Sequence, residues 1–486
     1  MLALMQLAEI VSPWHWIAIA FWAITELLVV IFVWRVVASG GAPASTLLWI
    51  VVILVLPYGT GLLLYYLFPR RLQLKRLRRL RTSQQRWRSP SRPRDDDAQQ
   101  ELQDQGPMCR LLAGIAPDSL ARGNRVSWLA SGSDFFQAAA LAIEGSRTFV
   151  HFEVYIFRPD ATGLRLLELL TAAARRGVQV RLLYDSFGSF SLKGRHLAAL
   201  REAGGRAEPF MPLLWKRRPF TVNLRCHRKI LVVDGAVAFT GGRNVGDEYA
   251  NDRFGKKRKW LDAMVRVEGP AVAAMHELFA EDWFYATDEE LNDARWYPAQ
   301  PSVGQDTVGI VASGPDRDRQ PLWLAAFQAI SDARTSIDVS SPYLVPPPSL
   351  ALALFVAAAR GVRVRVFTNG RRSEAIVLYH AQRSYYDELI ENGIEVYETE
   401  SDYNHAKALV VDGKMAMVGS ANLDLRSAHL NFEVAAVLPD SPDFAREVLR
   451  TLDERAAACR RVTSPAQKIA IMRLVDGFCR LLSPLL

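Results

Sequence analysis

Cysteine and metal-binding residue patterns are scarce in this sequence. Four cysteines occur in 486 residues, and no two have the C-x-x-C spacing. This excludes a disulfide-stabilised scaffold, gives no sign of a zinc site and is consistent with reduced thiols in the cytosol. No cluster of Asp, Glu and His has an obvious metal-ligand spacing either. We therefore expect neither a metal nor a cofactor.

Outside one short segment, basic residues do not outnumber acidic residues, although the net charge of the whole chain is +8. Residues 70–94 hold 11 Lys and Arg and no acid, which leaves 48 basic and 51 acidic residues elsewhere. A nuclease spreads basic residues over its binding face, so no nucleic-acid partner is expected. A basic stripe beside an apolar segment instead marks the cytoplasmic side of a membrane and attracts anionic lipid.

Long apolar runs are confined to the first 69 residues. Residues 14–37 and 47–68 each reach the roughly 20 apolar residues that a membrane-spanning helix needs. A signal peptide is disfavoured because no Lys or Arg precedes the first run. We expect residues 1–69 to form a transmembrane helical hairpin in the inner cell membrane, with residues 70–107 as a basic juxtamembrane segment and linker. The loop between the two runs is short and uncharged, so the remaining chain would face the cytoplasm.

The rest of the sequence contains an internal repeat. The pattern H-x-K-x4-D occurs twice, 178 residues apart, and each copy is followed at the same offsets by G-G/S-x-N. Upstream, residues 142–160 resemble 329–347, and residues 171–185 resemble 356–370. The repeated positions are His227, Lys229, Asp234, Gly242 and Asn244 in the first copy and His405, Lys407, Asp412, Ser420 and Asn422 in the second.

Each repeat alternates short β-branched runs with helical patterns, which is typical of an α/β fold. We predict two α/β domains, residues 108–300 and 301–486, packed about a pseudo-twofold axis. That packing would bring the two His-Lys pairs into one cleft. Two further segments, the loop 210–220 and an amphipathic C-terminal tail at 469–486, mix apolar and cationic residues. Docking on the protein body and docking on lipid remain equally open for both.

Two histidines, two lysines and two asparagines in one cleft would bind an anion such as a phosphate group. One histidine could attack phosphorus while the other protonates the leaving alkoxide, which requires opposite protonation states near neutral pH. A carboxylate should orient each histidine, and Asp262 and Glu433 are the candidates. Cys226 precedes His227, so strand alternation points it to the opposite face, where a core role is expected.

These paired motifs resemble the phospholipase D superfamily, and the stretches around them resemble bacterial cardiolipin synthases in particular. The resemblance covers about residues 10–486 and implies a phosphohistidine intermediate without a metal. It favours His227 as the nucleophile and His405 as the acid and base, although the sequence leaves this assignment open. It implies phosphate contacts from Lys229, Lys407, Asn244, Asn422 and Ser420, with the backbone N–H of Gly242 in place of a second serine hydroxyl. Within the catalytic motifs, Asp234 and Asp412 are expected to fix local structure.

The expected function is therefore transfer of a phosphatidyl group between two phosphatidylglycerol molecules, giving cardiolipin and glycerol. The partners would be phosphatidylglycerol, other anionic phospholipids and the membrane. Alternatives are a phospholipase D that uses water, phosphatidylethanolamine or a small alcohol as acceptor, a membrane-tethered nuclease, and an inactive scaffold. The acceptor and the oligomeric state stay open.

Overall fold

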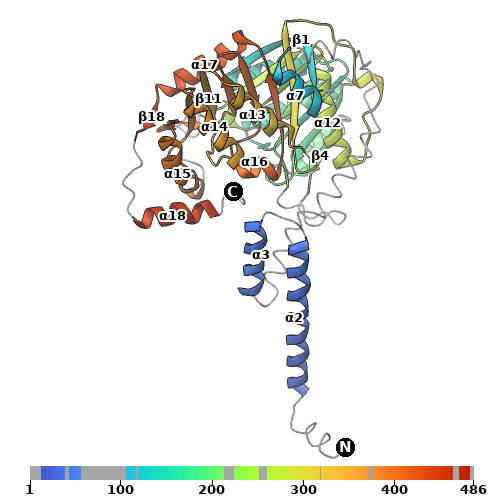
Figure 1. The fold of residues 1–486 in the computed structure, drawn as a ribbon. Helices are drawn as coiled ribbons and strands as arrows, with labels where there is room; N and C mark the ends of the chain where they lie inside the picture. Colours follow the sequence, from blue (N-terminus) through green and yellow to red (C-terminus); the bar gives the residue numbers. More distant parts are fainter. Residues whose placement is uncertain are drawn as a thin grey trace, which may run out of the picture. The chain divides into compact units, whose positions relative to one another are not determined.

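The computed structural model describes residues 13–38, 43–55, 105–116, 119–212, 224–250, 260–317, 319–371, 376–463 and 470–481. These residues divide into two compact units, an N-terminal helical unit and a large α/β body, and each is described by itself. Figure 1 shows their elements. Most of the linker at 70–107, most of the loop at 210–220 and part of the second apolar run lie outside the described residues.

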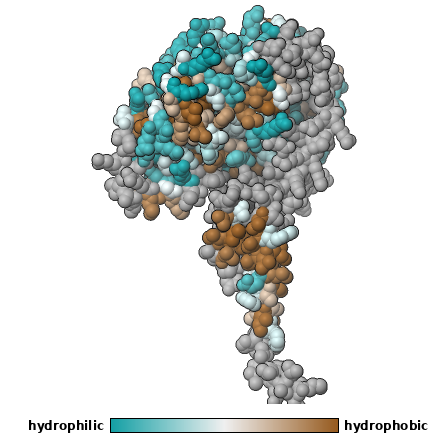
Figure 2. All heavy atoms as spheres, viewed as in Figure 1, coloured by the Kyte–Doolittle hydropathy of each residue, from teal (hydrophilic) through white to brown (hydrophobic). Residues whose placement is uncertain are grey.

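The N-terminal unit consists of α2 (Pro13–Ala38) and α3 (Pro43–Val55). Ile53 of α3 is buried against Val29 and Val33 of α2. Most of the described α2 side chains are exposed and apolar, and Figure 2 shows the resulting apolar surface in brown. Within the described ranges, no helix combines the length and the apolar character that crossing a membrane would require.

The body is organised around one sheet of 16 strands. Its two halves have mirrored strand orders, β4-β3-β2-β6-β7-β9-β1 and β10-β17-β16-β15-β11-β12-β13, and they meet where β1 pairs with β10 in antiparallel fashion. This mirrored order is the one that two repeats related by a twofold axis produce, and the α/β fold class is confirmed.

The strands of the first half are β1 (Leu120–Leu129), β2 (Phe149–Val154), β3 (Gln179–Asp185), β4 (Arg206–Phe210), β5 (Arg225–Cys226), β6 (Ile230–Val233), β7 (Val237–Gly241), β8 (Trp260–Leu261) and β9 (Met264–Glu268). Those of the second half are β10 (Asp306–Ser313), β11 (Ser336–Ser340), β12 (Arg363–Asn369), β13 (Glu395–Thr399), β14 (Tyr403–Asn404), β15 (Ala408–Val411), β16 (Met415–Gly419), β17 (Asn431–Leu438) and β18 (Cys459–Val462).

Helices cover both faces of this sheet, because alternate residues of its central strands are apolar on each face. In β2, for example, Phe152 packs into the core beneath α8 and α9, whereas its neighbour His151 stacks on Phe279 of α12 on the other face. His151 Nδ1 also lies 2.7 Å from His276 Nε2, so both histidines have a buried structural position. The helices are α7 (Pro107–Ile115), α8 (Gly132–Gly145), α9 (Ala161–Arg175), α10 (Gly194–Glu202), α11 (Asp247–Ala250), α12 (Val272–Thr287), α13 (Pro321–Asp332), α14 (Pro348–Ala359), α15 (Ile376–Glu391), α16 (Leu425–His429), α17 (Pro442–Ala456) and α18 (Ala470–Leu481).

Asp234, the aspartate of the first repeated motif, closes the hairpin between β6 and β7. Asp234 and Gly235 have φ angles of 53° and 64°, which are those of a type I′ turn. The Asp234 carboxylate accepts hydrogen bonds from the backbone N–H groups of Arg147, Thr148 and Phe149. It thereby fastens the start of β2 to the hairpin, at the opposite end of β6 from His227.

Asp412 has the same position in the second half. Its φ angle is 54°, and it accepts from the N–H groups of Arg334, Thr335 and Ser336. These bonds hold the pKa of both aspartates below the ordinary value, although burial opposes the shift. Neither aspartate lies among the reactive groups, and the contacts of both agree with the expected role in local structure.

Candidate active site

The two histidines are carried by short strands that cross between the halves. The first histidine strand, β5, pairs in parallel with β17 of the second half, and β14 pairs in parallel with β8 of the first half. The pairing continues into the histidines themselves: His227 N donates to Phe432 O at 2.9 Å, and His405 N donates to Leu261 O at 2.6 Å. Each half therefore places the histidine of the other.

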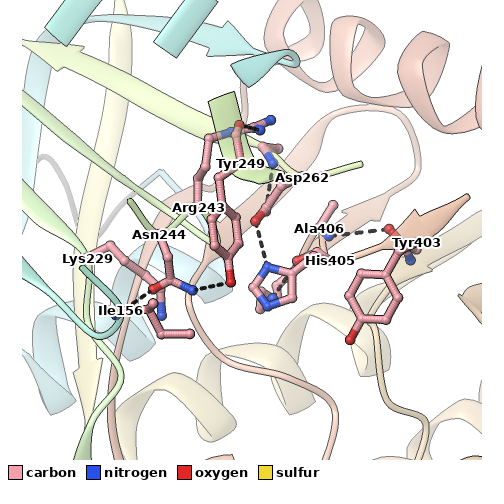
Figure 3. A network of polar contacts seen from close by, with 12 residues as sticks. Ile156, Lys229, Arg243, Asn244, Tyr249, Asp262, Tyr403, His405 and Ala406 are labelled. Carbon is pink, nitrogen blue, oxygen red and sulfur yellow. Dashed lines mark hydrogen bonds and ion pairs between the residues drawn. The ribbon is translucent and has the colours of Figure 1, made fainter. Parts of the chain in front are cut away.

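Each histidine is bound by a carboxylate from the opposite half. His227 Nδ1 lies 2.9 Å from Glu433 Oε2, and His405 Nδ1 lies 2.6 Å from Asp262 Oδ2. Figure 3 shows Asp262 beside the His405 imidazole. Glu433 and Asp262 are fully buried, and both histidines are less than a tenth exposed. A carboxylate on Nδ1 fixes the ring so that Nε2 is the nitrogen available for chemistry.

Both histidines are neutral before substrate binds. Burial lowers the pKa of His227 to about 4, although Glu433 raises it. Burial and Lys407 lower the pKa of His405 to about 3, against the effect of Asp262. Although burial alone would raise the pKa of Glu433, His227 and Lys229 lower it to about 2, so this carboxylate is ionised. A neutral imidazole is the form that a nucleophile needs.

The two lysines lie at the same centre, because both of them act on the pKa of both histidines. Lys229 Nζ donates to His227 O at 2.7 Å, and Lys407 Nζ donates to His405 O. Two ammonium groups and two carboxylates give the empty site a net charge near zero. A bound phosphodiester adds one negative charge, which favours protonation of one imidazole and thereby creates the acid that the leaving group requires.

Lys229 leads to a prediction about pH. Burial lowers its pKa to about 7, and Glu433 only partly offsets this effect. The charged form exists below that pKa and is lost above it, so we expect kcat/KM to fall as the pH rises above about 7. A bound anion raises the pKa again, so kcat should fall at higher pH than kcat/KM. Initial rates between pH 5.5 and 9 at constant ionic strength measure both, and parallel kcat and kcat/KM profiles would contradict the prediction.

Besides the two lysines, four groups are predicted to contact phosphate, and they are placed unequally. Asn422 is buried, and its side chain hydrogen-bonds the Asp424 carboxyl, whereas its Oδ1 has no hydrogen-bond partner among the described residues. An amide oxygen only accepts hydrogen bonds, so this atom suits a donor such as a headgroup hydroxyl rather than a phosphate oxygen. Asn244 Nδ2 donates to Tyr249 Oη at 3.2 Å and its Oδ1 accepts from Ile156 N, as Figure 3 shows. Ser420 Oγ donates to Glu433 Oε2 at 2.5 Å. The serine thus holds the carboxylate that orients His227.

Gly242 differs from its prediction. Its backbone N–H, expected to replace a serine hydroxyl at phosphate, donates to Ala263 O at 3.1 Å because β7 and β9 remain paired there. The glycine has another function in the site. A Cβ atom on Gly242 would lie 2.3 Å from Asp262 Oδ1 and 3.0 Å from Lys407 Cδ. Only a hydrogen fits between the two halves at this position.

We therefore expect Gly242→Ala to lower activity by roughly 10- to 100-fold, the range found when a group that orients a reactive ligand is disturbed. The added methyl group displaces Asp262 from His405 while leaving both reactive histidines in place. Cardiolipin formation in detergent micelles measures the loss. Gly145→Ala is the matched control, because nothing lies within 4 Å of a Cβ at that glycine. Equal activity of the two variants would show that Asp262 is not constrained in this way.

Aromatic rings form a wall around the histidines that the motif analysis did not include. Tyr155 packs edge-on against His227 at 5.0 Å between ring centroids, and Trp260 lies 5.5 Å from His405. The Tyr403 ring packs against the Trp260 ring at 4.3 Å between centroids, with the two planes tilted by 41°. Trp260 and Tyr403 precede Asp262 and His405 by two residues, so strand alternation was the signal that could have identified them. Such rings exclude water and thereby strengthen the charge interactions of the site.

Behind His227 lies a buried polar cluster on the far side of β5. Cys226, fully buried as expected, donates its Sγ–H to Glu153 Oε1 at 2.6 Å. Glu153, Cys226 and Asp282 each bring one potential metal-ligand atom within 4.8 Å of the others. The Arg228 guanidinium pairs with Asp282 in the same cluster and donates to Glu433 O. The arginine already supplies the positive charge, so these residues do not suit a metal ion and instead support the strand that carries Glu433.

Comparison with known proteins agrees with this geometry. Residues 141–283 and 326–456 match the family described as "Cardiolipin synthase, PLD-like domain". The chain is 36% identical over 471 residues to "Cardiolipin synthase" of Geobacillus kaustophilus, covering 94% of this chain and 92% of the relative. It is 33% identical over 495 residues to "Cardiolipin synthase" of Halalkalibacterium halodurans, covering 98% and 96%.

Among solved structures, the phosphatidylserine synthase of Haemophilus influenzae Rd KW20 superposes with a TM-score of 0.60 at 13% identity. It covers 78% of this chain and 100% of that chain, which shows a shared fold. Each matched region covers the larger part of one half of the body and includes one complete histidine motif. The chain therefore belongs to the cardiolipin synthase family of phospholipase D-like proteins.

Proposed function

We propose that the chain synthesises cardiolipin from two phosphatidylglycerol molecules by way of a phosphatidyl-histidine. The observation that carries this proposal is the crossed arrangement of two histidines, each with Nδ1 on a buried carboxylate of the other half. Two equivalent imidazoles with two lysines suit a displacement at phosphorus in which one imidazole attacks and the other transfers a proton.

In the first half-reaction, Nε2 of His227 attacks phosphorus and the bond from phosphorus to the glycerol headgroup breaks. His405 donates a proton to the departing glycerol oxygen. In the second, the headgroup hydroxyl of another phosphatidylglycerol gives its proton to His405 and attacks phosphorus, and the phosphorus–nitrogen bond breaks. One phosphodiester replaces another, so the balance requires neither a nucleotide nor a redox partner.

The test uses purified protein in vesicles of labelled phosphatidylglycerol without added nucleotide or metal. Cardiolipin and glycerol in equal amounts would support transfer between two lipids. Phosphatidic acid as the main product would mean that water is the acceptor and that the protein is a phospholipase D. Unchanged lipids with intact vesicle binding would favour the inactive scaffold.

We further propose that the protein is attached to the membrane by its N-terminal helical hairpin, with the body on the cytoplasmic side. The exposed apolar side chains of α2 and the basic run at 70–94 support this topology. Labelling of single cysteines placed in the 39–42 loop and in the body, by a reagent that does not cross membranes, tests it. Labelling of the loop from the outside only is the expected result, and equal labelling of both positions from one side would contradict it.

The C-terminal helix α18 offers a second contact with lipid. One face docks on α15, where His380 Nδ1 lies 2.7 Å from Asp476 Oδ1 and the Arg480 guanidinium lies 4.2 Å from the centre of the Tyr385 ring. The other face leaves Leu474 and Phe478, one helical turn apart, 74% and 64% exposed. One face of the predicted amphipathic tail thus docks on the protein body, and the exposed apolar pair on the other face supports the proposed contact with lipid.

In protein reconstituted into phosphatidylglycerol vesicles, we expect Leu474→Ser/Phe478→Ser to weaken the contact of α18 with lipid by roughly tenfold or more, because each apolar side chain contributes about 1.5–3 kcal/mol when it is fully buried. Since the hairpin keeps every variant in the membrane, the change is measured at α18 itself, as faster amide hydrogen exchange of residues 470–481. The matched control is Leu141→Ser/Leu164→Ser, which removes two exposed leucines from α8 and α9. A similar loss in both double variants would show that α18 has no special contact with lipid.

A further inference from the structure

A cavity lies between α13, α14 and the sheet of the second half. Its walls are mainly apolar, and the space that it offers to a ligand is about 70 Å³. A buried water molecule needs roughly 10–15 Å³ of such space, so the cavity has room for a short apolar segment of several methylene groups. The apolar walls include Leu322, Ile330, Val339, Leu354, Leu409 and Met417. Lys407 and Asn422 also line it, so the cavity reaches two groups of the proposed active site.

The first half contains larger side chains at the equivalent positions. Phe152, Leu231 and Phe239 lie side by side on β2, β6 and β7, and Val339, Leu409 and Met417 lie in the same register on β11, β15 and β16. Gly241 and Gly419 occupy equivalent positions in the two halves. Gly241 pairs with Met264 on β9, whereas Gly419 pairs with Ala435 on β17. The larger residues of the first half and their counterparts are Phe152 and Val339, Phe239 and Met417, and Met264 and Ala435.

One buried position of the helix above these strands differs in the same direction. Phe135 on α8 packs against Phe239 at 5.9 Å between ring centroids and fills the core of the first half. The repeat places Leu322 of α13 at the equivalent position. The cavity is thus a consequence of smaller residues at several matching positions, distributed over a helix and three strands. A random packing defect would not collect at the phosphate end of one half only in this coordinated way.

We propose that this cavity binds an acyl chain of the phosphatidyl group that is being transferred. The inference rests on the proposed function, because a phosphatidyl group is the ligand that carries both a phosphate for Lys407 and an apolar chain for the walls. Trp323 Nε1, on a cavity-lining residue, is buried without a hydrogen-bond partner among the described residues. An ester carbonyl oxygen between phosphate and chain can accept a hydrogen bond from this N–H.

Photo-crosslinking locates the chain directly. The full-length protein is incubated with phosphatidylglycerol that carries a diazirine midway along one acyl chain, irradiated and digested. We expect adducts on peptides from residues 405–419 and 321–332, which contain the cavity walls of β15, β16 and α13. Adducts confined to α2, α18 or the first half would overturn the proposal.

Filling the cavity tests its effect on substrate choice. The variant Val339→Phe/Ala435→Met introduces the residues that the first half already accommodates, and it should melt at or above the wild-type temperature because it fills empty space. Both proteins receive the same mixture of dihexanoyl and dilauroyl phosphatidylglycerol in micelles, so lipid partitioning cancels. We expect the preference for the longer chain to fall by roughly tenfold or more, which corresponds to about two buried methylene groups.

Leu352→Phe is the matched control, since it adds a ring at a 61% exposed position of α14 between the cavity-lining residues Leu350 and Leu354. It should keep the wild-type preference and the crosslinks. An unchanged preference in the folded cavity-filled variant would reject the acyl-chain site. Crosslinks in the cavity without any cardiolipin formation would instead reject the proposed transfer while leaving the lipid site standing.

Discussion

Replacement of His227 by alanine should lower cardiolipin formation by roughly 10⁴- to 10⁶-fold, as removal of a nucleophile does in other covalent mechanisms. Replacement of His405 by alanine should cost roughly 10²- to 10⁴-fold, the range of general acid catalysis. The difference arises because loss of the acid slows the departure of glycerol, whereas loss of the nucleophile removes the intermediate itself. The two imidazoles have nearly the same environment and similarly lowered pKa values, so the rates alone do not identify the nucleophile.

The covalent intermediate identifies it. Protein is mixed with short-chain phosphatidylglycerol and quenched in base, where phosphohistidine survives, and its intact mass is measured. We expect the phosphatidyl adduct in wild type and, more slowly, in His405→Ala, but not in His227→Ala. An adduct that persists in His227→Ala and is lost in His405→Ala would reverse the assignment. His196→Ala is the control, because this histidine lies on α10 and contacts Lys193 and Arg195 at the surface.

Replacement of Glu433 by glutamine should have the next largest effect, a loss of roughly 10²- to 10⁴-fold in kcat. The amide can still accept a hydrogen bond from His227 Nδ1, so the ring stays close to its position. The negative charge is lost, and with it the stabilisation of the positive charge that the imidazole gains when Nε2 bonds to phosphorus. KM should change little, because the carboxylate contacts the histidine and Ser420 rather than the lipid.

The control is Glu398→Gln, another buried glutamate, which accepts from Tyr386 and Arg460 in the second half. This variant serves as the control because a merely structural loss would affect both variants alike. Adduct formation under single-turnover conditions should slow in Glu433→Gln and stay at the wild-type rate in Glu398→Gln. Equal slowing in the two variants would mean that Glu433 acts only by packing.

The reactive residue types and their convergence could be predicted from the sequence, because the duplicated spacing His227-x-Lys229 and His405-x-Lys407 requires one shared chemistry. The turn role of Asp234 also follows from the adjacent glycine, since Asp-Gly is a hairpin signal. The spacing within each motif and the Asp-Gly pair are local signals, because each depends only on residues within a few positions of one another, and the repeat itself supplies the convergence.

The crossed pairing could not be predicted, because it depends on which strands lie next to each other over about 200 residues. Asp262 follows the first motif in the chain but binds His405 of the second. The same limit explains Gly242, whose N–H is used by a strand pair and whose missing side chain makes room for Asp262. The cavity likewise became apparent only when the register of the two halves showed which residues correspond.

Each half supplies the carboxylate for the histidine of the other half, and this has a consequence for how the sequence can change during evolution. Neither half can work alone, so the two resemble subunits of a dimer that have been joined into one polypeptide. In a dimer of identical subunits, every substitution appears on both sides of the axis. Joining the subunits removes that constraint, so one side can keep a serine beside its carboxylate and open a space for a lipid chain while the other keeps a glycine and a filled core. Asymmetry of this kind lets one protein distinguish a donor from an acceptor that are chemically the same molecule.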